Sequence, residues 1–197
     1  MKNLLLILFV SVAFMACGGK GKSAAELARL DSLRKDSIMK DSIAKANFTS
    51  PDLITFDLKG PVQTVIVGGN EDKITFDENG TIVSHSATLV ENISRNDEGY
   101  IESIYITGES QSFDYDLEAK KLKSVTGGDG GYSYTRTYEY NEAGDAITEK
   151  WKTVDEVEGS SDSGVNQIEI TKRDNYGNWI ERKVGVGTET RQITYYK

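Results

Sequence analysis

The sequence predicts an all-β domain, an antiparallel meander of repeated hairpins, preceded by a partly helical tether. Three observations lead to this fold class. From residue 48 onward, β-branched and aromatic residues alternate with polar ones, as in strands with one buried face. Turn signals recur at a near-constant spacing in the same region. Before residue 48 the composition favours a charged helix instead.

Residues 1–16 have the pattern of a secretory signal peptide, with Lys2 before an apolar run from Leu4 to Phe14. This run is too short to span the bilayer's hydrocarbon core of about 30 Å. The segment Phe14-Met15-Ala16-Cys17 resembles a bacterial lipobox, which implies cleavage before Cys17 and lipidation of its thiol. The residues after Cys17 resemble those of outer-membrane lipoproteins, and we expect the periplasm-facing side because no acidic stretch follows. A secreted protein with an unmodified Cys17 is the alternative.

Residues 17–47 carry the expected tether. A pentapeptide repeat, Asp-Ser-(Leu/Ile)-x-Lys, fills residues 31–45, and its five-residue period advances about 500° around a helix. Its apolar residues therefore form no continuous stripe, which predicts a solvated spacer rather than the alternative, an oligomerising helix. The repeat resembles the acceptor motif of a bacterial O-glycosylation system, which implies sugars on Ser32, Ser37 and Ser42. An unmodified low-complexity repeat explains the same pattern.

The turn signals define the β-domain, residues 48–197. An Asp or Asn precedes a Gly by three residues at Asp57–Gly60, Asp77–Gly80, Asn96–Gly99, Asn141–Gly144 and Asp174–Gly177, and Asp116 to Lys120 continues the series. This pattern is typical of type I turns, in which the short side chain caps the turn and Gly takes the exit dihedral. We expect one hairpin per unit, a further turn within residues 127–131, and a long loop over the Gly/Ser-rich residues 158–164.

Two of these units, Tyr138-Glu-Tyr140-Asn141-Glu-Ala-Gly144 and Asp174-Asn-Tyr-Gly177-Asn-Trp179-Ile180, resemble the YD-repeat (Rhs-like) family. The start of the domain, residues 56–62, resembles that of small envelope lipoproteins of the same construction. The resemblance covers residues 52–197 and implies stacked antiparallel hairpins in a twisted sheet. The repeat motif carries no catalytic residues, so it implies architecture rather than an activity.

Charge and composition narrow the function classes. The chain has a net charge of -8, which disfavours nucleic acid as a partner. The positive charge is concentrated in the tether, which faces an anionic membrane, and the β-domain is acidic. A single Cys and a single His exclude an internal disulfide and multi-histidine metal sites, and we expect no cofactor and no metal. The acidic turns match no ordered calcium loop.

The candidate binding residues are aromatic. Tyr132, Tyr134, Arg136, Tyr138 and Tyr140 have the same parity, so a straight strand places them on one face. Trp151 and Trp179 follow turns and are candidates for the same role. Such rings stack on sugars or anchor a partner, but the core side of a sheet uses them equally well. His85 is interpreted as a strand-surface residue.

The function predicted from these features is non-enzymatic: an outer-membrane-anchored lipoprotein that binds or scaffolds an envelope protein or glycan. Two alternatives remain open. One is a hydrolase of envelope polysaccharide that uses two carboxylates, which a cleft with suitably spaced acids would support. The other is an immunity-like or spacer protein, suggested by the Rhs resemblance.

Overall fold

The computed structural model describes residues 23–68, 73–85, 88–89, 92–106 and 108–197. It divides into two units, Met1–Lys40 and Asp41–Lys197, with the boundary inside the helix α1 (Ala24–Ala46). The side chain of Ser23 accepts a hydrogen bond from the amide of Glu26 and caps the start of this helix. Leu33, Ile38 and Met39 are all more than half exposed, as expected for a helix whose apolar residues form no stripe. The helical part of the predicted tether is confirmed.

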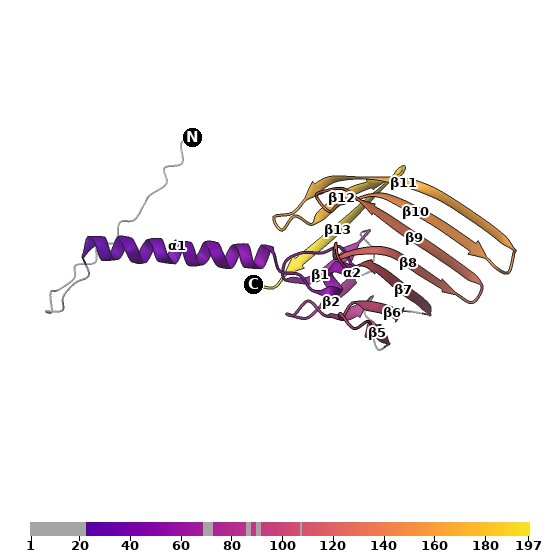
Figure 1. The fold of residues 1–197 in the computed structure, drawn as a ribbon, viewed down its shortest axis with the longest axis horizontal. Helices are drawn as coiled ribbons and strands as arrows, with labels where there is room; N and C mark the ends of the chain where they lie inside the picture. The colour runs from indigo at the N-terminus through magenta and orange to yellow at the C-terminus, as the bar shows by residue number, and fades with distance from the viewer. Residues whose placement is uncertain (1–22, 69–72, 86–87, 90–91, 107) are drawn as a thin grey trace, which may run out of the picture. The chain divides into compact units, whose positions relative to one another are not determined.

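In the described part of the domain, the strands form one antiparallel sheet of thirteen strands (Figure 1). The strands are β1 (Val62–Val67), β2 (Lys73–Phe76), β3 (Ile82–His85), β4 (Thr88–Leu89), β5 (Ile93–Arg95), β6 (Ile101–Ile106), β7 (Glu109–Asp116), β8 (Lys121–Asp129), β9 (Tyr132–Tyr140), β10 (Ala146–Asp155), β11 (Ser160–Arg173), β12 (Trp179–Val184) and β13 (Gly187–Tyr195). Their order is β4-β3-β2-β1-β13-β12-β11-β10-β9-β8-β7-β6-β5. Each strand pairs with its neighbours in sequence, except that β4 and β5 form the two edges of the sheet and β1 also pairs with β13. The predicted all-β meander is confirmed.

The repeated turn motif has one geometry at four places. In the turns that begin at Asp77, Asn96, Asn141 and Asp174, the Gly three residues on donates its amide to the carbonyl of that first residue. All four Gly residues have φ between +75° and +86°, which a side chain disfavours. The first residue's Oδ1 also accepts an amide from the residue four positions on, as Asp77 does from Thr81 at 2.8 Å. In the turn that follows Asp116, the residue with positive φ is Lys120, at +53°, and not a Gly.

Two expectations about local structure are wrong. Residues 51–55 form a short helix, α2 (Pro51–Thr55), and Asp57–Gly60 lies in the loop after it rather than in a hairpin turn. Ser50 caps α2 by accepting the amide of Leu53, and Pro51 fits the first helical position. The Gly/Ser-rich residues 160–164 are not a loop, because they belong to the 14-residue strand β11 and pair in register with β10.

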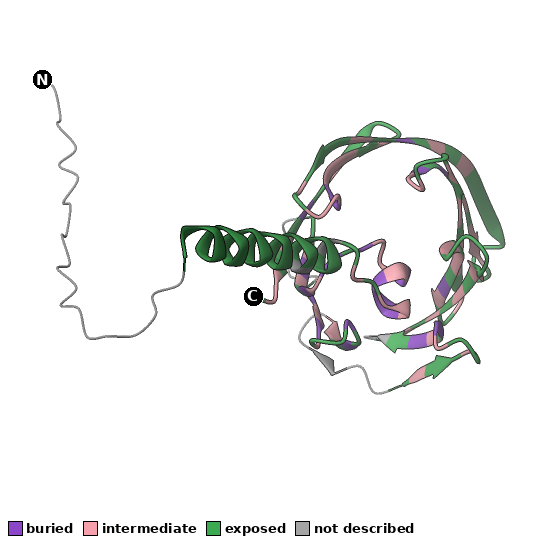
Figure 2. Cartoon of the chain, turned by 60° about the vertical axis from the view of Figure 1, so that its left-hand side comes forward, coloured by how far each residue is buried: buried purple, intermediate pink, exposed green. Residues whose placement is uncertain are grey.

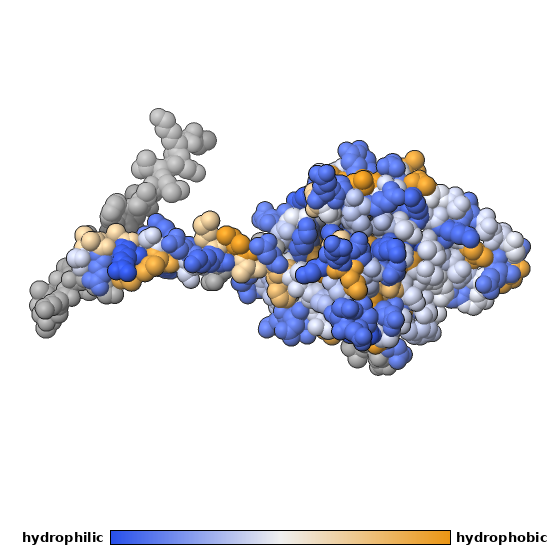
Figure 3. All heavy atoms as spheres, viewed as in Figure 1, coloured by the Kyte–Doolittle hydropathy of each residue, from blue (hydrophilic) through white to orange (hydrophobic). Residues whose placement is uncertain are grey.

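The segment Asn47–Gly60, here called the plug, lies within the curve of the sheet (Figure 2). Buried Leu53 and Leu58 form the apolar core with strand residues Val62, Val65, Ile74, Phe76, Ile82, Ile101 and Ile104. The core therefore occupies the side of the domain formed by β1–β3 and β6. Outside, the face seen in Figure 3 is mainly hydrophilic, with scattered apolar side chains.

Polar contacts fix the plug to strands on both sides. Buried Asp52 forms a salt bridge with Arg95 of β5, and its Oδ2 accepts the amide of Ile82 at 2.8 Å. On the other side, the side chain of Asn178 accepts a hydrogen bond from the backbone amide of Lys59 and donates one to its carbonyl, both at 2.8 Å. Arg191 of β13 donates to the carbonyl of Asp57 at 2.9 Å. Burial lowers the pKa of Arg191 to about 10, so hydrogen bonding must offset the cost of its charge.

We expect Gly80→Ala to destabilise the domain more than Gly177→Ala. Both glycines have positive φ, and about 1 kcal/mol is the cost of that conformation for Ala. At Gly177 a Cβ meets no atom within 4 Å, whereas at Gly80 it comes within 2.7 Å of Ser50 Oγ and 2.9 Å of Leu53 Cδ1 in the plug. Urea unfolding of both variants measures the difference, expected at about 1–3 kcal/mol. Equal losses would contradict the close approach of plug and turn.

Candidate functional site

The concave face of the sheet, the face toward the plug, carries the candidate site. Tyr138 and Tyr140 of β9 line a cavity of about 130 Å³ together with Phe56 and Asp57 of the plug, which identifies their side of the strand as concave. Arg136 and Tyr134 have the same parity on β9, so they share this face. The sequence-predicted row is thus placed toward the interior, away from the outer surface.

Tyr132 is the exception within that row. It lies at the end of β9, is 46% exposed, and lines a shallow pocket at the β8–β9 hairpin with Asp129 and Glu156. It lies beside the two-residue turn Gly130–Gly131, at the opposite end of β9 from Tyr140. Tyr132 therefore does not join the ring cluster around Tyr138.

Two aromatic rings on this face lie over glycines of the neighbouring strand. Tyr134 is paired with Gly127 of β8, and a Cβ at that Gly would come within 2.6 Å of the phenol carbon Cζ. Trp151 of β10 is paired with Gly164 of β11, where a Cβ would come within 2.7 Å of the indole ring. Each ring thus covers bare backbone and lies flat on the sheet. Both side chains are half-buried, so part of each remains accessible.

A set of polar groups lies beside the two rings on the same face. Arg136 is the register partner of Trp151, and its guanidinium is 3.9 Å from the carboxylate of Glu149. Asn166 of β11 donates to the same carboxylate at 3.1 Å. The guanidinium of Arg136 also lies 5.4 Å from the centroid of the Tyr134 ring. One half-exposed Arg, one buried carboxylate and one amide thus combine on three adjacent strands.

Trp179, the first residue of β12, is buried and contacts the plug. The guanidinium carbons of Arg182 and Arg191 lie 4.1 and 3.9 Å from the centroid of its ring. Its indole N–H donates to Asp57 at 3.0 Å, and its carbonyl accepts from Arg191 at 2.5 Å. With only 5% of its surface exposed, this Trp is positioned for packing.

The remaining predicted residues are dispersed. Ser32, Ser37 and Ser42 lie exposed on α1, while Cys17 and the signal peptide lie outside the described residues. His85 is on β3, in register with Ile74 of β2. Sequence reasoning missed Glu149, Asn166 and the two covered glycines. Their shared face depends on strand register, although a glycine opposite an aromatic residue in adjacent strands is a usable signal once the hairpins are aligned.

Burial and neighbouring carboxylates raise the pKa values of the phenols on this face. Burial raises the pKa of Tyr138 and Tyr140, and the charges of Glu149 and Asp57, respectively, raise them further. For Tyr134, burial is joined by Glu109, which accepts the phenol's hydrogen bond at 2.5 Å. Tyr115, which contacts Thr55 of the plug, has its pKa raised by burial to about 12. These hydroxyls therefore remain protonated donors at neutral pH.

Among the described residues, no cluster of three or more His, Cys, Asp or Glu side chains is placed to hold a metal ion. No helix in the described part of the chain has the length and apolar character needed to cross a membrane. Neither a protein-family model nor a curated protein matches the sequence. The YD-repeat resemblance therefore remains a prediction, and the function is argued from the site.

We expect Glu109→Gln to lower the pKa of Tyr134, because it removes the negative charge that faces the phenol. Absorbance of tyrosinate during an alkaline titration measures this shift, and Glu139→Gln on the opposite face of β9 is the matched control. The raised pKa values also stabilise the fold: their contribution is complete below pH about 10 and is lost as the pH rises through the folded values. For Tyr115 this window runs from about pH 10 to about 12. If the pKa of Tyr134 is unchanged in Glu109→Gln, the hydrogen bond between Tyr134 and Glu109 is contradicted.

Proposed function

We propose that this chain is a non-enzymatic envelope lipoprotein whose concave face binds a glycan. The observation that carries the proposal is the pair of flat rings, Tyr134 and Trp151, beside Arg136, Glu149 and Asn166. Sugar rings present C–H groups to aromatic faces and hydroxyls to planar polar groups, so a site for them combines both kinds of side chain.

The polarity of this face favours a glycan over a protein partner. A stable protein interface centres on an apolar, fully desolvated patch with few charges. Here the rings alternate with a guanidinium and a carboxylate, and Arg136 retains about half of its side-chain exposure. The sheet is curved (Figure 2), and its concave face suits an extended ligand that crosses the neighbouring strands β8 to β11. A protein scaffold role remains the alternative outcome of the test below.

The tether supports the anchored part of the proposal. Acylation of Cys17 would hold the chain to a membrane, and α1, at 23 residues, provides a spacer of about 35 Å. Its exposed Ser32, Ser37 and Ser42 would be accessible to a glycosyltransferase. Lys and Arg residues of the tether would lie close to anionic lipid headgroups.

Glycan binding is tested with the full-length chain in detergent on an array of bacterial envelope glycans that includes N-acetylglucosamine oligomers. We expect at least one polysaccharide class to bind, and Trp151→Ala and Arg136→Gln to weaken it about tenfold or more, because each removes a direct contact. Gly164→Ala should weaken it too, by pushing the indole ring off the sheet.

Lys150→Gln is the matched control for this experiment, because Lys150 adjoins Trp151 on β10 but points to the opposite face, where it pairs with Glu139 at 2.5 Å. Circular dichroism verifies that each variant folds. Absence of glycan binding, or binding that is insensitive to Trp151 and Arg136, would overturn the proposal. Capture of one envelope protein by this face would favour the scaffold role instead.

Lipidation is tested by metabolic labelling with radioactive palmitate during expression in a bacterium. We expect the wild-type chain to incorporate label and to fractionate with the outer membrane. Cys17→Ser should lose both properties, because Cys17 is the only thiol in the sequence. Ser23→Ala, which alters the tether without touching the thiol, should keep them. Label retained by Cys17→Ser would refute the anchor.

A further inference from the structure

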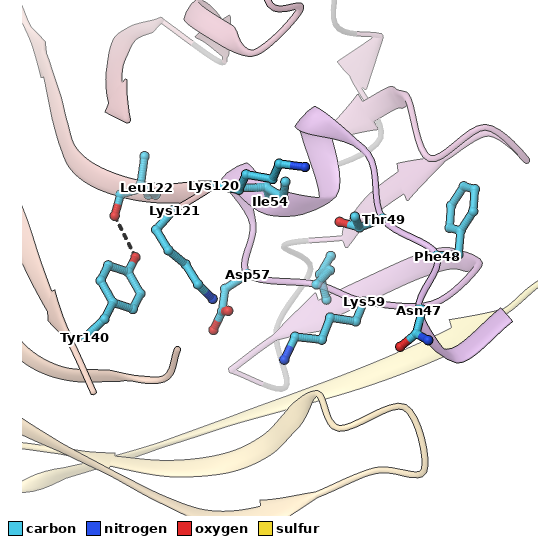
Figure 4. Close-up of a pocket in the computed structure, with 11 residues that line it drawn as sticks. Asn47, Phe48, Thr49, Ile54, Asp57, Lys59, Lys120, Lys121, Leu122 and Tyr140 are labelled. Carbon is cyan, nitrogen blue, oxygen red and sulfur yellow. Dashed lines mark hydrogen bonds between the residues drawn. The ribbon is translucent and has the colours of Figure 1, made fainter. Parts of the chain in front are cut away.

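A second cavity, here called the lysine pocket, lies between the plug and the start of β8 (Figure 4). Its volume is about 330 Å³. Apolar side chains form part of its wall, among them Phe48, Ile54 and Leu122. Charged residues also line it: Lys59 and Asp57 from the plug, and Lys120 and Lys121 from the other side. This combination is typical of a small-molecule site, which pairs an apolar wall with a few convergent polar groups.

The charge of the lining is positive in a domain that is otherwise acidic. Three ammonium groups are opposed by a single carboxylate, that of Asp57. In the described part of the chain, none of the three lysines has a carboxylate oxygen within 4 Å. By contrast Lys123, two residues after Lys121, pairs with Asp114 at 3.0 Å on the outer surface.

Asp57 is already engaged, and this leaves the lysines available to a ligand. Its Oδ2 accepts the indole N–H of Trp179 at 3.0 Å. Lys121 donates to the carbonyl of Gly144 at 2.6 Å and lies 5.4 Å from the centroid of the Tyr140 ring, so its ammonium group is held in place. Figure 4 shows the Lys59 and Lys121 side chains extending toward the same region beside Asp57.

The backbone at Lys120 is a further indication. It has φ +53°, whereas the four Asp/Asn–Gly hairpin turns described above use Gly for the positive-φ residue. A side chain in this conformation costs about 1 kcal/mol relative to Gly. Residues held in such conformations are concentrated at functional sites. Figure 4 shows the Lys120 side chain running past Ile54, so Lys120 forms part of the wall beside α2, while Lys59 and Lys121 point toward the region beside Asp57.

We propose that the lysine pocket binds a small amphiphilic anion, with a carboxylate or phosphate group held by Lys59 and Lys121 and an apolar body against Phe48, Ile54 and Leu122. Charge-assisted hydrogen bonds to ammonium groups supply the affinity for the head group. The apolar wall selects against a bare inorganic anion. This site is independent of the glycan proposal, because it uses neither Trp151 nor Arg136.

Isothermal titration calorimetry on the full-length chain, in detergent below its aggregation threshold and at about 0.15 M ionic strength, tests the proposal. The probes are phenylbutyrate, phenylbutanol and hexyl phosphate, which vary the head group on an apolar body. We expect the two anions to bind at least about tenfold more tightly than the alcohol. Which anion binds better distinguishes carboxylate from phosphate chemistry.

The variants Lys59→Gln and Lys121→Gln remove the charges while keeping a polar side chain. Each should weaken anion binding about tenfold and leave phenylbutanol unchanged. Lys183→Gln, on the outer face where Lys183 pairs with Glu169, is the control and should bind like wild type. Equal affinity for anion and alcohol, anion binding that survives both lysine variants, or dissociation constants above about 10 mM for every probe would overturn the proposal.

Discussion

The polar attachment of the plug is the constraint on which the rest of the domain depends. A curled sheet of thirteen strands needs an interior, and here the interior is a segment of the same chain that precedes the first strand. Asp52 with Arg95 on one side, and Arg191 with the plug carbonyls on the other, bury charge at two separated places. Removal of one partner would leave the other charge without compensation, which costs several kcal/mol. The plug thereby fixes both the position of the apolar core and the part of the concave face that it leaves polar.

The sequence was most informative where a local rule determines the structure. Asp or Asn three residues before Gly specifies a turn by its own hydrogen bonds and by a φ that Gly tolerates, so four hairpin turns could be located from residue type alone. The same rule misplaced Asp57–Gly60, because a Ser-Pro-Asp capping signal just upstream starts α2 and carries the chain into its loop. The Gly/Ser-rich composition of residues 158–164 predicted a long loop, whereas residues 160–164 belong to the long strand β11, in which the Trp151 ring covers Gly164.

The candidate sites were predictable only in part, since they depend on pairing between distant strands. Parity along β9 was sufficient to place Tyr134, Arg136 and Tyr138 together, because period two is a local property. Glu149 and Asn166 join them through the registers of β10 and β11, which no single strand encodes. The lysine pocket is further from prediction: Lys59 and Lys121 are about 60 residues apart, and their side chains point toward one region only because the plug folds inside the sheet.

The pairing of β1 with β13 has a consequence for when the domain can fold. Val62 is in register with Tyr195, so the first strand waits for the last one to be synthesised and, for an exported chain, translocated. Until then β1 has a neighbour on one side only, and the plug lacks its contacts with Arg191 and Asn178. Hairpins from β6 to β10 can form early because their contacts are local, but the core can close only at the end. The order of the strands thus delays closure of the core until β13 has been synthesised.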